Sequence, residues 1–128
     1  MSLPDAFARQ NYLNIETFRR NGVGVQTPVW FAQDGNLLYV VTQASTGKVK
    51  RIRRSGRVNV APCRMNGRLV GSWVPAQARE NADPDVKAKV DRLLDRKYGL
   101  MRKLFGLGRS GRRGADTVLE IELVEEIH

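Results

Sequence analysis

One short stretch of the chain holds most of the residues suited to chemistry, with small hydroxyl side chains followed by basic ones. It contains, in order, Thr42, Ser45, Thr46, Lys48, Arg51 and Arg53. A helix that starts after Thr46 would present free backbone N–H groups and its positive dipole end, and Lys48 would add a full charge in the first turn. Such a helix start binds phosphate, and the two arginines could reach carboxylates or a second phosphate. The alternative is that Thr46 only caps a short helix with a solvated basic face.

Other reactive residue types are sparse. Cys63 is the single cysteine, and His128, at the last position, is the single histidine. One thiol cannot form an internal disulfide, and the sequence has no cluster of Cys and His residues to bind a metal. We therefore predict no metal site and assign no catalytic side chain, and we expect Cys63 to be a buried structural thiol.

The elements that must position the basic stretch are mostly β-strands. Apolar patterning predicts six strands, at residues 12–18, 23–32, 37–42, 57–64, 68–78 and 117–124. Two helices are inserted among them. The first, at 47–55, has Val49 and Ile52 on one face, and the second begins at Pro84 with Asp83 as its cap. This order, without an internal repeat, predicts a mainly β protein with a six-stranded barrel.

The chain of 128 residues is predicted to form a single domain. An N-terminal segment at 1–11 precedes the first strand, a helical insertion covers 83–107, and a basic, glycine-rich loop at 106–114 is expected to be mobile. No apolar stretch approaches the roughly 20 residues that span a bilayer, and the first residues lack the apolar run of a secretory signal. We therefore predict a cytoplasmic protein without a membrane partner.

The formal net charge of +9 is unevenly distributed. Residues 47–57 and 96–113 are rich in Lys and Arg and contain no acidic residue. A basic surface favours an anionic partner: a nucleic acid, an acidic membrane, or a ligand with phosphates and carboxylates. Nucleic-acid modules tend to place aromatic side chains on their strands for base stacking, whereas Trp30, Phe31 and Tyr39 lie within apolar runs. A basic barrel that binds RNA or single-stranded DNA is therefore the less favoured interpretation.

Three segments in a fixed order carry a resemblance to a known family. They are TPVWF at 27–31, TGKVKRIRR at 46–54 and VNVAPC at 58–63. With the strands between them, these segments resemble the pyridoxamine 5′-phosphate oxidase-like, FMN-binding split-barrel superfamily, and most closely its actinobacterial F420-dependent branch. The resemblance covers roughly residues 12–77. It implies a flavin-reductase-like split β-barrel that forms a homodimer, with the cofactor in a groove between the subunits.

The resemblance also implies roles for individual residues. The phosphate side of the cofactor would be held by Thr42, Thr46 and Lys48. The second strand would run beside the tricyclic ring and present backbone groups to its polar edge through Thr27, Pro28 and Val29. Asn59 would line the adjacent wall, and Trp73 is a candidate for a contact made by the second subunit.

Two departures from the family pattern bear on which cofactor is bound. FMN-binding oxidases of this family usually carry an Arg and a Lys on the second strand and an Arg directly before the loop lysine. This chain has the apolar TPVWF run and Gly47 at those places. The long anionic tail of F420 could instead use the helix arginines. We therefore predict an F420-dependent oxidoreductase, acting as a reductase on a small organic substrate. The alternatives are an FMN-dependent oxidoreductase of the same fold and a cofactor carrier.

Overall fold

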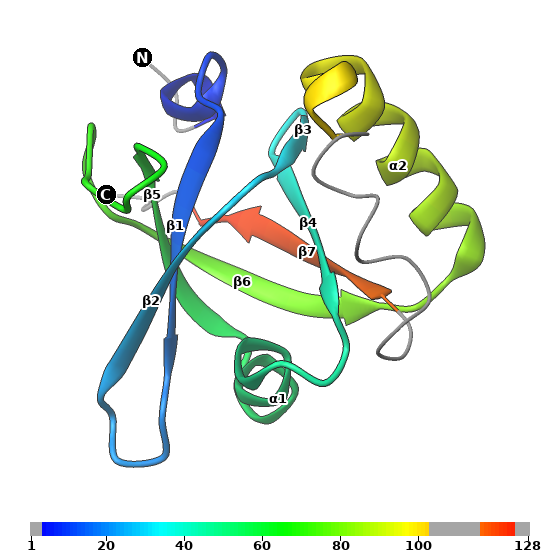
Figure 1. Ribbon diagram of the computed structural model, residues 1–128. Helices are drawn as coiled ribbons and strands as arrows, with labels where there is room; N and C mark the ends of the chain where they lie inside the picture. Colours follow the sequence, from blue (N-terminus) through cyan, green and yellow to red (C-terminus); the bar gives the residue numbers. More distant parts are fainter. Residues whose placement is uncertain (1–3, 103–115, 125–128) are drawn as a thin grey trace.

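A single antiparallel sheet, strongly curled, forms the body of the protein in the computed structural model, which describes residues 4–102 and 116–124 (Figure 1). The elements in chain order are η1 (Pro4–Phe7), β1 (Tyr12–Phe18), β2 (Gly24–Val29), β3 (Ala32–Asp34), β4 (Leu37–Gln43), α1 (Gly47–Arg54), β5 (Arg57–Cys63), β6 (Val74–Asn81), α2 (Pro84–Tyr98) and β7 (Asp116–Leu123). The strand order is β2-β1-β5-β6-β7-β4-β3. The two edge strands, β2 and β3, are consecutive in the chain, so the sheet forms a half-barrel that is open between them.

The described sheet has seven strands, which corrects the prediction of six. The segment predicted as one strand at 23–32 is divided into β2 and β3 by Trp30 and Phe31. At Phe31 the backbone N–H donates to the Tyr98 hydroxyl at 3.1 Å, and that hydroxyl also lies 3.1 Å from the Phe31 carbonyl oxygen. Since these backbone groups bond to a side chain of α2, the strand is interrupted there.

The strand predicted at 68–78 begins only at Val74. After β5 the chain turns at Gly67, whose φ of 89° favours glycine, and the Gly67 N–H donates to the Arg64 carbonyl at 2.8 Å. The chain then runs back alongside the end of β5, where Leu69 forms an isolated bridge to Cys63. Residues 64–73 therefore form a folded connection before β6. The predicted loop at 106–114 and the end of the predicted helical insertion, 103–107, lie outside the described residues.

The alternation of side chains along the strands creates two cores. On the concave face, Leu38 and Val40 of β4 meet Leu119 and Ile121 of β7 in the main core, which also contains Val49 and Ile52 of α1. On the other face of the same strands, a second core forms against α2, and its buried members are Ala32, Tyr39, Val90, Leu94, Tyr98 and Val118. The sheet thus separates α1 from α2.

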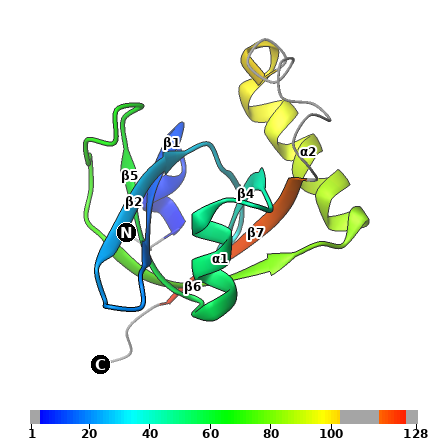
Figure 2. The same cartoon turned by 60° about the horizontal axis from the view of Figure 1, so that its bottom comes forward.

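The N-terminal segment contributes to the main core. Phe7 of η1 is fully buried and packs edge-on against Phe31, with ring centroids 6.1 Å apart and an interplanar angle of 85°. Figure 2 shows α1 in front of the curled sheet and α2 beyond β7, and both views place the two helices on different sides of the molecule. Within the described residues, no helix is long and apolar enough to cross a membrane.

Candidate functional site

The predicted ligand-binding stretch forms the connection from β4 into α1. β4 ends at Gln43, the Thr46 N–H donates to the Gln43 carbonyl at 3.2 Å, and the helix begins at Gly47. Thr46 stands at the N-cap position, as the alternative interpretation has it, but its hydroxyl makes no capping hydrogen bond. Its Oγ1 is buried without a hydrogen-bond partner among the described residues. An unpaired buried hydroxyl costs free energy unless a ligand satisfies it.

Two cations, Lys48 and Arg51, follow Thr46 on the first turns of α1. Lys48 is half-buried, and its pKa is lowered by burial and, to a lesser extent, by the nearby positive charge of Arg51. The Arg51 guanidinium lies over Gly47, where an added Cβ would come within 2.8 Å of Nη1. Arg51 Nε donates to Oγ1 of Thr17 on β1 at 2.7 Å. Among the described residues neither cation forms an ion pair with a carboxylate.

Arg53, on another side of α1, already has an acidic partner. Its Nε and Nη2 donate to the two carboxylate oxygens of Glu80 on β6, at 2.7 and 2.9 Å. Hydrogen bonding from Arg53 is the main cause of a lowered pKa of the Glu80 carboxyl. The structure therefore separates Arg53 from Lys48 and Arg51. The assignment of Arg53 to cofactor binding stays a prediction.

Side chains predicted on β2 and β5 fall on two different faces of the sheet. Thr27 and Val29 pair with Ile15 and Leu13 of β1 and share their concave face, towards the main core. Pro28 lies opposite Asn14 and points to the convex face. Because β2 is an edge strand, half of its backbone groups have no neighbouring strand with which to form hydrogen bonds. The predicted role of β2, to present backbone groups to a ligand, requires such groups.

Asn59 lies on the convex face of β5, between the inward-facing Val58 and Val60. Its Nδ2 donates to Glu16 Oε1 at 3.1 Å, and Gln26 Nε2 donates to the other oxygen of Glu16 at 3.3 Å. Trp73 is half-buried just before β6. Within one chain the convex-face residue Asn59 therefore does not share a surface with Thr27 and Val29.

Thr42 and Ser45 complete the predicted set. Thr42 is half-buried near the end of β4, on the face of Leu38 and Val40, and pairs with Thr117 of β7. Ser45 is exposed in the turn before α1. The structure thus gathers Thr42, Ser45, Thr46, Lys48 and Arg51 around one helix start. We call these five residues the β4–α1 cradle. No group of three or more Cys, His, Asp or Glu side chains with metal-binding geometry occurs in the described part of the chain.

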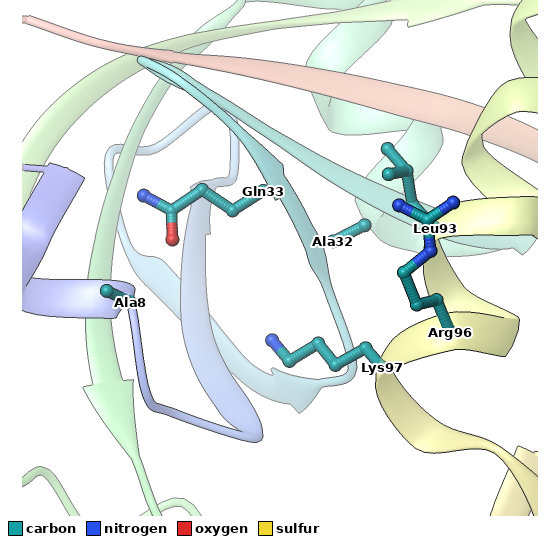
Figure 3. Close-up of a pocket in the computed structure, with 6 residues that line it drawn as sticks. All are labelled: Ala8, Ala32, Gln33, Leu93, Arg96 and Lys97. Carbon is teal, nitrogen blue, oxygen red and sulfur yellow. The ribbon is translucent and has the colours of Figure 1, made fainter.

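A cavity that the sequence analysis did not anticipate lies between the N-terminal segment, β3 and α2. It has a volume of about 340 Å³ and is lined by Ala8, Ala32, Gln33, Leu93, Arg96 and Lys97 (Figure 3). In the sequence, Arg96 and Lys97 look like ordinary cations in the last turn of a helix, so periodicity alone gave no signal. The Lys97 side chain is exposed overall, but its ammonium group lies 3.5 Å from the centroid of the Phe31 ring and donates to the Phe31 carbonyl at 3.0 Å.

The position of Lys97 predicts a pH dependence of stability. Burial of the ammonium group lowers the pKa of Lys97 to about 8 from 10.5. Between these two values the unfolded chain binds more protons than the folded one, so the free energy of unfolding is expected to rise with pH from about 8 to 10. Urea unfolding at several pH values should show this rise, and Lys97→Met should reduce it. An identical pH profile in the variant would contradict the prediction.

Comparison with known proteins establishes the fold. No family model and no curated protein sequence matches the chain. Among solved structures, it is similar to a candidate pyridoxamine 5′-phosphate oxidase from Listeria innocua (14% identity over 97% of this chain and 95% of that one, TM-score 0.67). It is also similar to the heme storage protein HutZ from Vibrio cholerae (11% identity, 95% and 87% coverage, TM-score 0.70).

A third similar structure is an F420 reductase (15% identity, 98% and 95% coverage, TM-score 0.62). Identities this low establish a shared fold and nothing finer. The chain therefore has the split-barrel fold of the pyridoxamine 5′-phosphate oxidase-like proteins. The similar structures thus include an F420 reductase and the heme storage protein HutZ, and another is a FAD-binding protein from Mesorhizobium loti.

Proposed function

We propose that the protein is an oxidoreductase that binds the deazaflavin cofactor F420 through the β4–α1 cradle and transfers a hydride to a small organic substrate. The observation that carries the proposal is the buried hydroxyl of Thr46, which has no hydrogen-bond partner among the described residues. It stands at the start of a helix whose first turns carry Lys48 and Arg51, two cations without a carboxylate partner in the same part of the chain. A phosphate group would accept from Thr46 and from free N–H groups at the start of α1, and it would compensate both charges. The cradle residues therefore fit a phosphate-bearing cofactor.

The choice of F420 over FMN depends on where the cations lie. FMN ends in a compact phosphate, and the places where FMN-binding oxidases of this family usually have further cations are occupied here by the apolar TPVWF run and Gly47. The longer tail of F420 carries a phosphodiester and several carboxylates. Arg51 lies where a second anionic group of such a tail could be bound. Arg53 could contribute only by exchanging Glu80 for a ligand carboxylate, because both of its side-chain hydrogen bonds among the described residues go to Glu80.

Bound F420 would supply the hydride, from C5 of its deazaflavin ring to an electron-poor double bond of the substrate. The chain would bind and orient the cofactor. Thr42, Thr46 and Lys48 would hold its phosphate, while β2 would offer unpaired backbone groups at Thr27–Val29 to the polar edge of the ring. The apolar side chains around Val29 would exclude water from that region. We assign no side chain to acid–base chemistry.

We also propose that two copies assemble with the cofactor groove between them. The separation of Asn59 from Thr27 and Val29 onto two faces supports this, since Asn59 could meet the same ligand only from a second subunit, the role also predicted for Trp73. The connection between β5 and β6 also exposes large apolar side chains, with Met65 72%, Val70 46% and Leu69 37% accessible. Analytical ultracentrifugation should give a dimer, and Val70→Asp should produce a monomer. A monomeric parent protein would contradict the assembly.

The cofactor proposal is tested by titrating the protein with F420 and, separately, with FMN, following fluorescence quenching. We expect tighter binding of F420, and we expect Lys48→Ala to weaken it about tenfold, because a charge-assisted hydrogen bond is lost. Lys50→Ala is the matched control, since it removes the same charge from an exposed position on the same helix. Equal effects of the two variants would mean non-specific attraction and would overturn the assignment of the cradle.

Further arms of the experiment separate the alternatives. Tighter binding of FMN than of F420 would mean that the cofactor is FMN. Oxidation of bound, reduced F420 by an electron-poor enone supports an oxidoreductase, whereas binding without any turnover over a panel of such acceptors would support the carrier. Failure to bind either cofactor, together with steeply salt-dependent binding of RNA, would overturn the proposal in favour of nucleic-acid binding.

A further inference from the structure

We propose that the cavity between the N-terminal segment, β3 and α2 is a second binding site, which takes a small organic carboxylate with an apolar body. The site is separate from the β4–α1 cradle, since α1 and α2 lie on different sides of the sheet. The inference does not depend on the proposed function, because none of the residues that line the cavity belongs to the cradle.

The lining divides into an apolar part and a polar part. Ala8, Ala32 and Leu93 provide apolar surface, and Lys97 and Arg96 bring two positive charges from α2. Figure 3 shows Lys97 extending from α2 towards the space between Ala8 and Gln33, while the guanidinium of Arg96 turns up beside Leu93. This combination matches a molecule with an anionic end and an apolar body.

The charges of the cavity are not compensated by carboxylates in the described part of the chain. Other cations of α2 are paired, Lys87 with Asp91, Lys89 with Asp34, and Arg102 with Asp91 and Asp95. In contrast, no described carboxylate lies within ion-pair distance of Lys97 or Arg96. The Lys97 ammonium donates to the Phe31 carbonyl and lies against the Phe31 ring. An ammonium has three donors, so others remain for a ligand.

The size and chemistry of the cavity favour a carboxylate over a larger polyanion. Its volume of about 340 Å³ is near the lower end of the range for small-molecule sites, roughly 300–1,000 Å³. The Gln33 side-chain amide is already engaged, since its Nε2 donates to the Pro4 carbonyl at 2.7 Å. Two cations with few further donors suit one carboxylate, and the three apolar residues suit a hydrocarbon or aromatic body.

Binding can be measured directly with 4-fluorobenzoate as the probe, observed by ¹⁹F NMR, without F420 or FMN. We expect saturable binding, at least tenfold weaker binding in Lys97→Met, and weaker binding of the uncharged 4-fluorobenzamide. Arg92→Gln is the matched control, since it removes a charge from an exposed position of α2 outside the cavity lining, and it should bind the probe normally. Arg96→Gln, at an exposed position, gives a second variant if Lys97→Met fails to fold.

The pH dependence gives an independent readout. A bound anion favours charged Lys97, so affinity should fall as pH rises above about 8, and this fall should be absent in Lys97→Met. Other charged or titratable groups on the surrounding elements are Arg96 and Tyr98 on α2, Asp34 on β3, which is paired with Lys89, and Asp5 and Arg9 in the N-terminal segment. The remaining ones, all on α2, are Asp85, Lys87, Asp91, Arg92 and Asp95, of which Lys87, Asp91 and Asp95 form ion pairs. Burial raises the pKa of Tyr98 to about 12, so it stays neutral over this range.

Several outcomes would overturn the site. The first three are no saturation at millimolar 4-fluorobenzoate, equal affinity for 4-fluorobenzamide, and unchanged affinity in Lys97→Met. The fourth is displacement of the probe only by ligands whose own binding is weakened by Lys48→Ala, which would place the probe in the β4–α1 cradle. Because the first three of these readouts need no cofactor, failure of this site and failure of F420 binding are distinguishable.

Discussion

Replacing Phe7 by alanine is expected to lower the free energy of unfolding by about 3–5 kcal/mol, the usual cost of removing a fully buried phenylalanine. The ring has no exposed surface and packs in the main core against Phe31, so its loss leaves a cavity between η1 and the sheet. The effect would show that the N-terminal segment is an integral part of the domain.

Urea unfolding followed by circular dichroism measures this effect. Val23→Ala serves as the control, because Val23 is 53% exposed in the turn between β1 and β2 and should change stability by less than about 0.5 kcal/mol. If Phe7→Ala costs no more than Val23→Ala, then η1 is not docked on the sheet in solution.

Replacing Tyr98 by phenylalanine is expected to cost about 2–3 kcal/mol, since several buried polar groups lose one shared partner. The hydroxyl accepts from the Phe31 N–H and lies 2.7 Å from the Asn11 carbonyl and 3.1 Å from the Phe31 carbonyl. The phenylalanine ring would keep the stacking on Trp30, whose ring centroid is 4.4 Å away at an interplanar angle of 7°. The substitution therefore isolates the hydrogen bonds.

Hydrogen exchange of the Phe31 amide gives a local readout besides urea unfolding. The amide should be protected in the parent protein and exchange faster in Tyr98→Phe. Tyr12→Phe is the control, because the Tyr12 hydroxyl makes no hydrogen bond within the described residues. An equally protected Phe31 amide in both variants would show that Tyr98 does not hold this backbone segment.

Local patterns were enough to predict several elements. β1 has the predicted bounds, and α1 buries the two predicted residues, Val49 and Ile52. The second helix begins at Pro84, and the Asp83 carboxylate accepts from the Asp85 N–H at 2.9 Å, as its position before an apolar helical repeat indicated. Each of these features depends on residues a few positions apart, which is the range over which sequence patterns are informative.

Features set by distant parts of the chain could not be predicted. The interruption between β2 and β3 depends on Tyr98, which is 67 residues from Phe31. For the same reason, the sequence indicated the cradle around Thr46 and Lys48 but not the pairing of Arg53 with Glu80, 27 residues away. The placement of Asn59 and Thr27 on opposite faces follows from strand register, which apolar patterning did not define in the edge strand β2.

The link at Trp30 and Phe31 joins the two edges of the half-barrel, and Tyr98 at the end of α2 bonds to the middle of that link. Separation of α2 from the sheet would therefore loosen β2 and β3 together. Edge strands with unpaired backbone groups are the usual starting points for pairing between chains. We expect self-association of this protein on partial unfolding to begin with the release of α2, so that the hydrogen bonds of Tyr98 protect against aggregation as well as stabilising the fold.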